Sequence, residues 1–151
     1  MIRIICYLFS FTFLFSCSEK PEKSRYDPDS GTVGLPKNDK GFIRLMDSAQ
    51  KHLPEFIHFL TENFSDTNYY YILKSAYKDA ESTEHMWSYP IGITGDTVTC
   101  ILIDSAYTLT NIKKGDTTQI LKTSIEDWAI FDTHGKVLKG NFSEKYLKGE
   151  E

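Results

Sequence analysis

The chain has 151 residues, 14% of them aromatic, and a formal net charge of −4. This length allows one domain with a hydrophobic core of its own, and the aromatic content argues against a disordered chain. The charged residues form no basic stripe, so the sequence gives no electrostatic support for nucleic-acid binding.

The amino terminus is typical of an export leader. Arg3 precedes a run at residues 4–15 that contains only apolar residues, Cys, Ser and Thr. Crossing a bilayer core of about 30 Å takes about 20 residues, so this run is too short for a transmembrane helix and fits a signal peptide. The run ends at Leu14-Phe15-Ser16-Cys17, which resembles the lipobox of bacterial lipoproteins.

The lipobox resemblance implies cleavage after residue 16 and acylation of Cys17, palmitate included. The signal peptide is then residues 1–16, and the lipid bilayer becomes the first partner of the mature chain. One acyl chain holds a protein weakly, whereas two or three on one cysteine make release slow. We therefore expect a lipid-anchored protein of the cell envelope, outside the cytoplasm, with the outer membrane and the cell surface as candidate locations and the membrane and leaflet left open. The alternative is a secretory leader or uncleaved anchor in which Cys17 is incidental.

Residues 17–40 have the composition of a tether. Three prolines and two glycines punctuate a stretch rich in Ser, Asp, Glu and Lys, without an apolar period. Such a segment behaves as a flexible linker that keeps the domain near the membrane.

An amphipathic helix is predicted next, because apolar residues from Phe42 to Leu60 recur on one helical face. Asn38 or Asp39 is placed to cap its start. Pro54 lacks an N–H, so we expect it to kink the helix or to open a second one.

Strands follow the helix, each bounded by turn residues. Pro90 indicates an edge or a bulge, Gly95-Asp96 a tight reversal, and Ser143 the cap of a short helix through Leu147. The predicted strands cover residues 69–77, 85–94, 98–103, 118–121, 128–131 and 136–139. The pattern predicts an α+β fold over residues 41–148, in which a kinked N-terminal helix packs on a strongly bent, mostly antiparallel sheet of five to seven short strands.

Three motifs in the strand region occur in a fixed order. They read Glu84-His85-Met86-Trp87, Leu109-x-x-Ile112-x-x-Gly115-Asp116 and Ile125-x-Asp127-Trp128. With this order and spacing, residues 69–142 resemble the bacterial family called domain of unknown function 2314, or YegJ-like. The resemblance implies the helix-plus-sheet fold and carries no established activity.

Acid–base chemistry has three weak candidates, His85 with Glu84 or Asp127. Glu84 and His85 are adjacent and point to opposite faces of a strand, so only one of them can share a face with Asp127. The alternative is a half-buried histidine with two carboxylates that accept hydrogen bonds at strand starts.

Metal and cofactor sites are not predicted. His52 and His58 are six residues apart and do not align on a helix, and His134 lies in a predicted turn. No CxxC, HExxH, P-loop or GxGxxG motif occurs. Cys100 lies in an apolar run and is predicted to be a buried small side chain.

Aromatic residues are the candidates for contact with a partner. Trp87 and Trp128 are predicted to be core residues, with the alternative that one lies in an exposed groove. Tyr69, Tyr70 and Tyr71 alternate faces on a strand, so at least one ring should be exposed; Tyr69 and Tyr71 are the candidates that share a face.

The sequence thus favours a membrane-anchored, non-catalytic binding module whose partner is an unknown protein or envelope ligand. One alternative is an envelope hydrolase that uses His85 with Glu84 or Asp127. Another is a protective, immunity-like surface factor.

Overall fold

The computed structural model describes residues 25–27, 32–34 and 39–147. The predicted signal peptide, Cys17 and the remaining residues of the predicted tether lie outside this part of the chain. The elements are β1 (Arg25–Asp27), β2 (Thr32–Gly34), α1 (Lys40–Glu62), β3 (Tyr69–Lys78), β4 (Thr83–Thr94), β5 (Thr97–Leu102), β6 (Thr117–Leu121), the 3₁₀ turn η1 (Lys122–Ser124), β7 (Ile125–Asp132), β8 (Val137–Gly140) and α2 (Phe142–Leu147).

Two short strands lie inside the segment for which only linker character is predicted. β1 pairs with β2 in an antiparallel ladder, with Tyr26 opposite Val33. Strands of three residues are too short to show an alternating hydrophobic pattern, so this ladder leaves no periodic signal in the sequence.

Helix α1 begins as predicted and continues further than predicted. The Asp39 carboxylate caps it by accepting a hydrogen bond of 2.9 Å from the Phe42 amide. The helix runs without a break through Pro54, so the alternative of a second helix that opens there is wrong. Pro54 leaves the Gln50 carbonyl without its helical donor, but burial of Leu53 and Phe56 on either side outweighs that loss.

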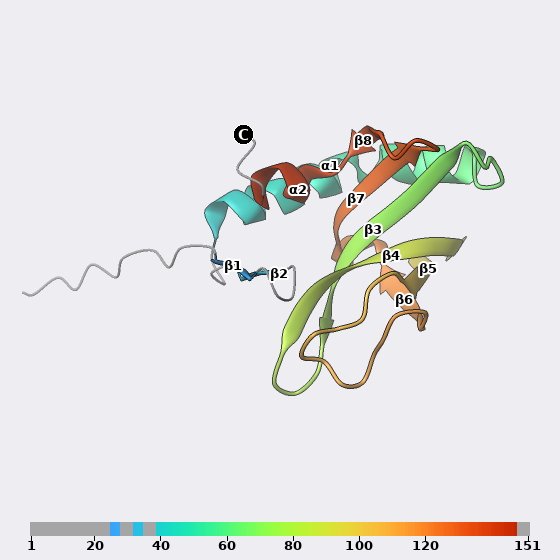
Figure 1. Ribbon diagram of the computed structural model, residues 1–151. Coiled ribbons are helices and arrows are strands. Elements are labelled where there is room, and N and C mark those ends of the chain that lie inside the picture. Colours follow the sequence, from blue (N-terminus) through green and yellow to red (C-terminus); the bar gives the residue numbers. More distant parts are fainter. Residues whose placement is uncertain (1–24, 28–31, 35–38, 148–151) are drawn as a thin grey trace, which may run out of the picture.

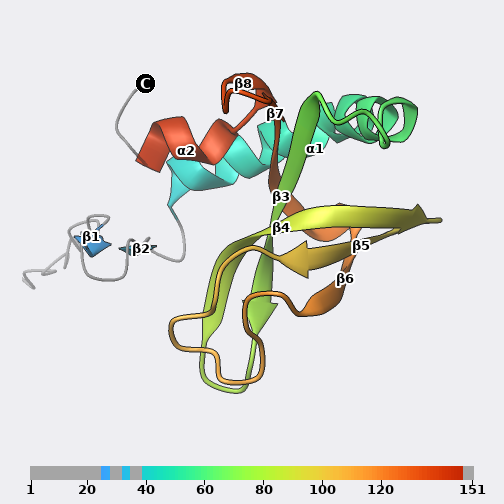
Figure 2. The same cartoon turned by 45° about the vertical axis from the view of Figure 1, so that its right-hand side comes forward.

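The six main strands form one open antiparallel sheet in the order β6-β5-β4-β3-β7-β8. The long central strand β3 pairs with β7 from Tyr69 to Ser75 and with β4 from Leu73 to Lys78. Its two partners therefore separate at the start of β3, and the sheet bends so that β4, β5 and β6 run across β3 and β7 (Figures 1 and 2). This arrangement confirms the predicted α+β fold.

The hydrophobic core lies between α1 and the inner face of this bent sheet. Trp128 of β7 is 1% exposed, stacks on Phe56 with ring centroids 5.1 Å apart, and donates its indole N–H to the Ala49 carbonyl at 2.9 Å. Four buried residues of α1 contact eight from the sheet: Ala49, Leu53, Phe56 and Leu60 against Tyr71, Leu73, Val98, Cys100, Ile120, Ile125, Trp128 and Ile130. Strands β5 and β6 thus share one core with β3 and β7.

Candidate functional site

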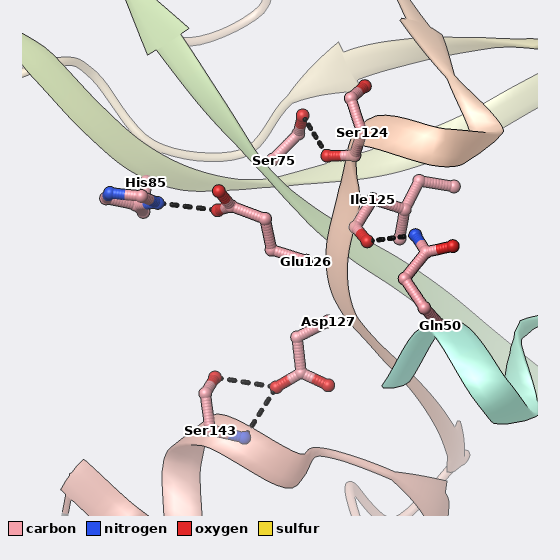
Figure 3. A network of polar contacts seen from close by, with 8 residues as sticks. All are labelled: Gln50, Ser75, His85, Ser124, Ile125, Glu126, Asp127 and Ser143. Atoms are coloured by element: carbon pink, nitrogen blue, oxygen red, sulfur yellow. Dashed lines mark hydrogen bonds and ion pairs between the residues drawn. The ribbon is translucent and has the colours of Figure 1, made fainter. Parts of the chain in front are cut away.

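His85 on β4 forms a close pair with a carboxylate that sequence reasoning did not select. Its Nδ1 lies 2.5 Å from Oε2 of Glu126 on β7 (Figure 3). The His85 side chain is 42% exposed and the Glu126 side chain only 10%. The Phe42 ring of α1 packs edge-on against the imidazole, with centroids 5.8 Å apart. Because Nδ1 faces Glu126, Nε2 is the ring nitrogen left for other contacts.

A bulge explains why Glu126 reaches His85. On β7, Asp127 lies opposite Lys74 of β3, and Ile125 lies opposite Ser75, so Glu126 is an extra residue without a partner in the ladder. A bulge re-aims the side chain at the inserted position. Glu126 therefore points toward His85 of β4, whereas Asp127 diverges from it and points toward Ser143 of α2 (Figure 3).

Glu84, one candidate partner for His85, holds a loop in place. Its carboxylate accepts hydrogen bonds from the backbone amides of Tyr107, Thr108 and Leu109 and from the Thr108 hydroxyl. Burial opposes ionisation of Glu84, but the bonds from Thr108 and the loop amides outweigh it and keep the carboxyl pKa below its usual value. The carboxylate thereby secures the loop that places Leu109 against Met86 in a second, smaller core.

Asp127, the other candidate, caps helix α2. Its Oδ2 accepts bonds from the Ser143 amide at 2.7 Å and the Ser143 hydroxyl at 2.6 Å. Its Oδ1 accepts from the amides of Phe142 at 3.1 Å and Trp128 at 2.7 Å. The prediction that Ser143 caps this helix is therefore wrong, because Ser143 lies inside α2 and donates to a cap supplied by β7. Neither predicted carboxylate is the partner of His85.

Lys74 is a charged residue of this region that sequence reasoning missed. It is 7% exposed, and its Nζ lies 5.3 Å from the centre of the half-buried Trp87 ring. Burial lowers the pKa of its ammonium group, and the nearby carboxylates of Asp127, Glu144 and Glu126 oppose that shift. The signal in the sequence was a single lysine in the middle of the apolar strand that begins at Tyr69.

The predicted aromatic candidates are mostly internal. Trp128 is in the core, Tyr71 is 8% exposed and donates its hydroxyl to the Asn63 carbonyl at 3.2 Å, and Tyr69 packs edge-on against Phe59. Tyr70, which points to the opposite face, is the exposed ring of the three, at 51%. This agrees with the prediction that at least one of the three rings is exposed.

An open cleft of about 300 Å³ lies where β3 and β4 separate. It is lined by the turn after α1, the start of β3 and one proline of β4: Phe64, Ser65, Asp66, Thr67, Tyr69, Tyr70, Tyr71 and Pro90. The β4 ladder shifts register between Pro90 and Gly92, as expected for a bulge at this proline. The cleft is therefore an aromatic recess beside two strand edges.

Other chemistry is limited in the part of the chain that the structure describes. No three His, Cys, Asp or Glu side chains come together there as a metal ion would require. No helix among these residues is long and apolar enough to cross a membrane. Cys100 is a fully buried free thiol, and burial raises its pKa to about 11, which confirms its prediction as a small core residue.

These features define a small α+β domain with an open sheet, an accessible histidine–glutamate pair and an open aromatic recess. The chain belongs to the bacterial family described as "Uncharacterized protein conserved in bacteria (DUF2314)", which matches residues 39–150. This match confirms the resemblance drawn from the three motifs. Neither the curated proteins nor the solved structures contain a match to the chain.

Proposed function

We propose that this protein is a lipoprotein of the bacterial cell envelope, anchored through acylated Cys17, whose α+β domain is a non-catalytic binding module. The anchoring is supported by the apolar run that ends at Leu14-Phe15-Ser16-Cys17. The ligand is an envelope protein or another envelope component within reach of the tether.

One observation supports binding rather than catalysis most strongly. Both carboxylates that the sequence predicted as acid–base partners of His85 hold backbone amides instead: Glu84 binds a loop, and Asp127 binds the start of α2. In the described part of the chain, His85 is hydrogen-bonded to Glu126 and packs against Phe42, and neither residue supplies a hydroxyl or thiol nucleophile. An exposed aromatic cleft is the kind of surface that partners recognise.

An envelope hydrolase is a second candidate, supported by the His85–Glu126 pair. A carboxylate on Nδ1 fixes the ring and supports Nε2 as a base, which is the relation a hydrolytic histidine requires. In this version Glu126 replaces Glu84 and Asp127 as the partner of His85.

The anchor is tested by expressing Cys17→Ala and Cys100→Ala in a bacterial host with a labelled palmitate analogue. We expect the wild type and Cys100→Ala to incorporate label and sediment with membranes, and Cys17→Ala to lose the label. Equal labelling of all three, or a mature chain that still begins at Met1 by intact mass, would contradict the anchor.

Binding and catalysis are separated by His85→Ala and Glu126→Gln. A binding module keeps its membrane-derived partners, identified by cross-linking, in both variants. Hydrolysis of ester, amide or glycoside substrates by the wild type that falls at least about 100-fold in both variants would instead establish the hydrolase.

A further inference from the structure

The cleft between β3 and β4 is bordered by two strand edges that the sheet leaves open. Over Tyr69–Ile72, β3 pairs with β7 on one side, and its ladder with β4 begins only at Leu73. Over Tyr89–Thr94, β4 pairs with β5 on one side. Backbone N–H and C=O groups on an open edge are a template for pairing with another chain.

The two open edges differ in how well they are protected. The β4 edge contains Pro90, which has no N–H, and a bulge between Pro90 and Gly92. Prolines and bulges are the devices that prevent strand pairing. The β3 edge, in contrast, reads Tyr-Tyr-Tyr-Ile and contains neither a charge nor a proline. Of the two, only β3 is suited to accept a strand.

We infer that this cleft binds an extended polypeptide segment of an envelope partner, which adds as a strand to β3 over Tyr69–Ile72. This inference rests on the proposed binding function and names the partner's chemistry. In strand addition, main-chain hydrogen bonds supply affinity, and pockets for alternate side chains supply specificity. Four residues of β3 extend for about 13 Å, which matches a short peptide motif.

The lining of the cleft specifies which side chains the segment carries. Phe64 is 49% exposed and Tyr70 is 51% exposed, and with Pro90 they form an apolar recess for an aliphatic or aromatic side chain. Asp66 lies at the same cleft, where its Oδ1 accepts bonds from the Asn68 amide and side chain at 2.9 and 2.8 Å. Its negative charge complements a Lys or Arg in the segment.

A glycan is the other ligand that tyrosine rings suit, but it would make no use of the open β3 edge. Sugars stack on aromatic faces and do not extend a β-ladder. The position of the cleft directly beside the edge of β3 that pairs with no described strand over Tyr69–Ile72 therefore favours a polypeptide.

The test selects peptides from a displayed library of random 12-residue sequences on the detergent-solubilised, full-length protein. We expect enrichment of alternating apolar sequences with a Lys or Arg. Synthetic versions should bind at least about tenfold more weakly to Tyr70→Ala than to wild type. Tyr107→Ala is the matched control, because Tyr107 is 69% exposed and does not line the cleft.

Backbone pairing is tested with the same peptide methylated on alternate amide nitrogens, which removes the main-chain donors of one edge. We expect one of the two methylation patterns to abolish binding. Equal affinity of both methylated peptides, or no enriched peptide that depends on Tyr70, would overturn the inference. Binding of chitotetraose that depends on Tyr70, without peptide enrichment, would assign the cleft to glycans and overturn it as well. Even if the inference fails in one of these ways, the proposed function still stands when Cys17 is labelled by palmitate and the protein cross-links to another envelope partner.

Discussion

The cap that β7 supplies to α2 can be broken with a change of one atom, Asp127→Asn. Each oxygen of Asp127 accepts two hydrogen bonds in the structure, two of them from Ser143. Asparagine keeps the shape of the side chain but replaces one acceptor oxygen with an NH₂ donor. In either orientation of the asparagine amide, its NH₂ group therefore faces the backbone N–H groups that donate to Asp127 in the wild type.

The expected loss of stability follows from these contacts. Asp127 is 1% exposed and Ser143 is 2% exposed, so water does not replace the lost acceptor. An unsatisfied buried donor costs about 1–3 kcal/mol, and a hydrogen bond to a charged group contributes about 1.5–3 kcal/mol. Lys74 also loses a carboxylate that supports its buried charge. We expect Asp127→Asn to lower the free energy of unfolding by about 3 kcal/mol.

Thermal unfolding followed by circular dichroism measures this loss. At about 4 °C per kcal/mol for a domain of this size, the midpoint should fall by about 12 °C. Asp96→Asn is the control, because Asp96 is exposed in the β4–β5 turn, and there we expect a change within about 2 °C. A midpoint for Asp127→Asn within about 2 °C of wild type would refute the argument that this carboxylate caps α2.

Three further predictions concern other parts of the domain. Gly140→Ala should destabilise the fold by about 3 kcal/mol in the same unfolding assay, because φ is +76° and an added Cβ would lie 2.1 Å from the Trp128 carbonyl oxygen. Gly135→Ala, with φ +77° but open space around it, should cost only about 1 kcal/mol, and equal costs would contradict the steric argument. Glu84→Gln should speed hydrogen exchange of the three loop amides that donate hydrogen bonds to the Glu84 carboxylate. The pKa of Glu84 in the folded protein is lowered from 4.5, so its contribution to the free energy of unfolding is complete above pH 4.5 and is lost as the pH falls through the folded pKa. A difference in unfolding free energy between wild type and Glu84→Gln that is constant with pH would contradict this role of Glu84. Cys100 should resist alkylation in the folded protein and react after unfolding, and rapid labelling of the native chain by peptide mass spectrometry would contradict its burial.

The motifs that identify the family turn out to be used by the fold itself. Glu84 secures the loop that follows β5, and Leu109 of that loop packs against Met86. Gly115 adopts a φ of +88°, which favours glycine, in the turn that leads to β6. Asp127 caps α2. The motif residues therefore stabilise the fold, and the proposed ligand site, the cleft beside β3, lies outside the three motifs.

Local physical chemistry in the sequence was sufficient for the fold class and for the helices and main strands from α1 onward. Apolar spacing predicted the buried face of α1, aromatic and β-branched runs predicted β3 to β8, and turn residues such as Gly95 marked the reversals. These signals depend on near neighbours, so they can be read without the tertiary structure. The same holds for the helix cap, which was narrowed to Asn38 or Asp39, and for Cys100 as a core residue.

Only the tertiary structure decided which side chains meet. The partner of His85 depends on one inserted residue in β7, and a shift of one position reverses the direction of every side chain that follows. The cap of α2 comes from Asp127, 15 residues before Phe142. The open edge of β3 exists because its partners on either side diverge along its length. Register, capping over long distances and sheet bending are set by packing among distant segments, and a pattern of neighbouring residues does not contain them.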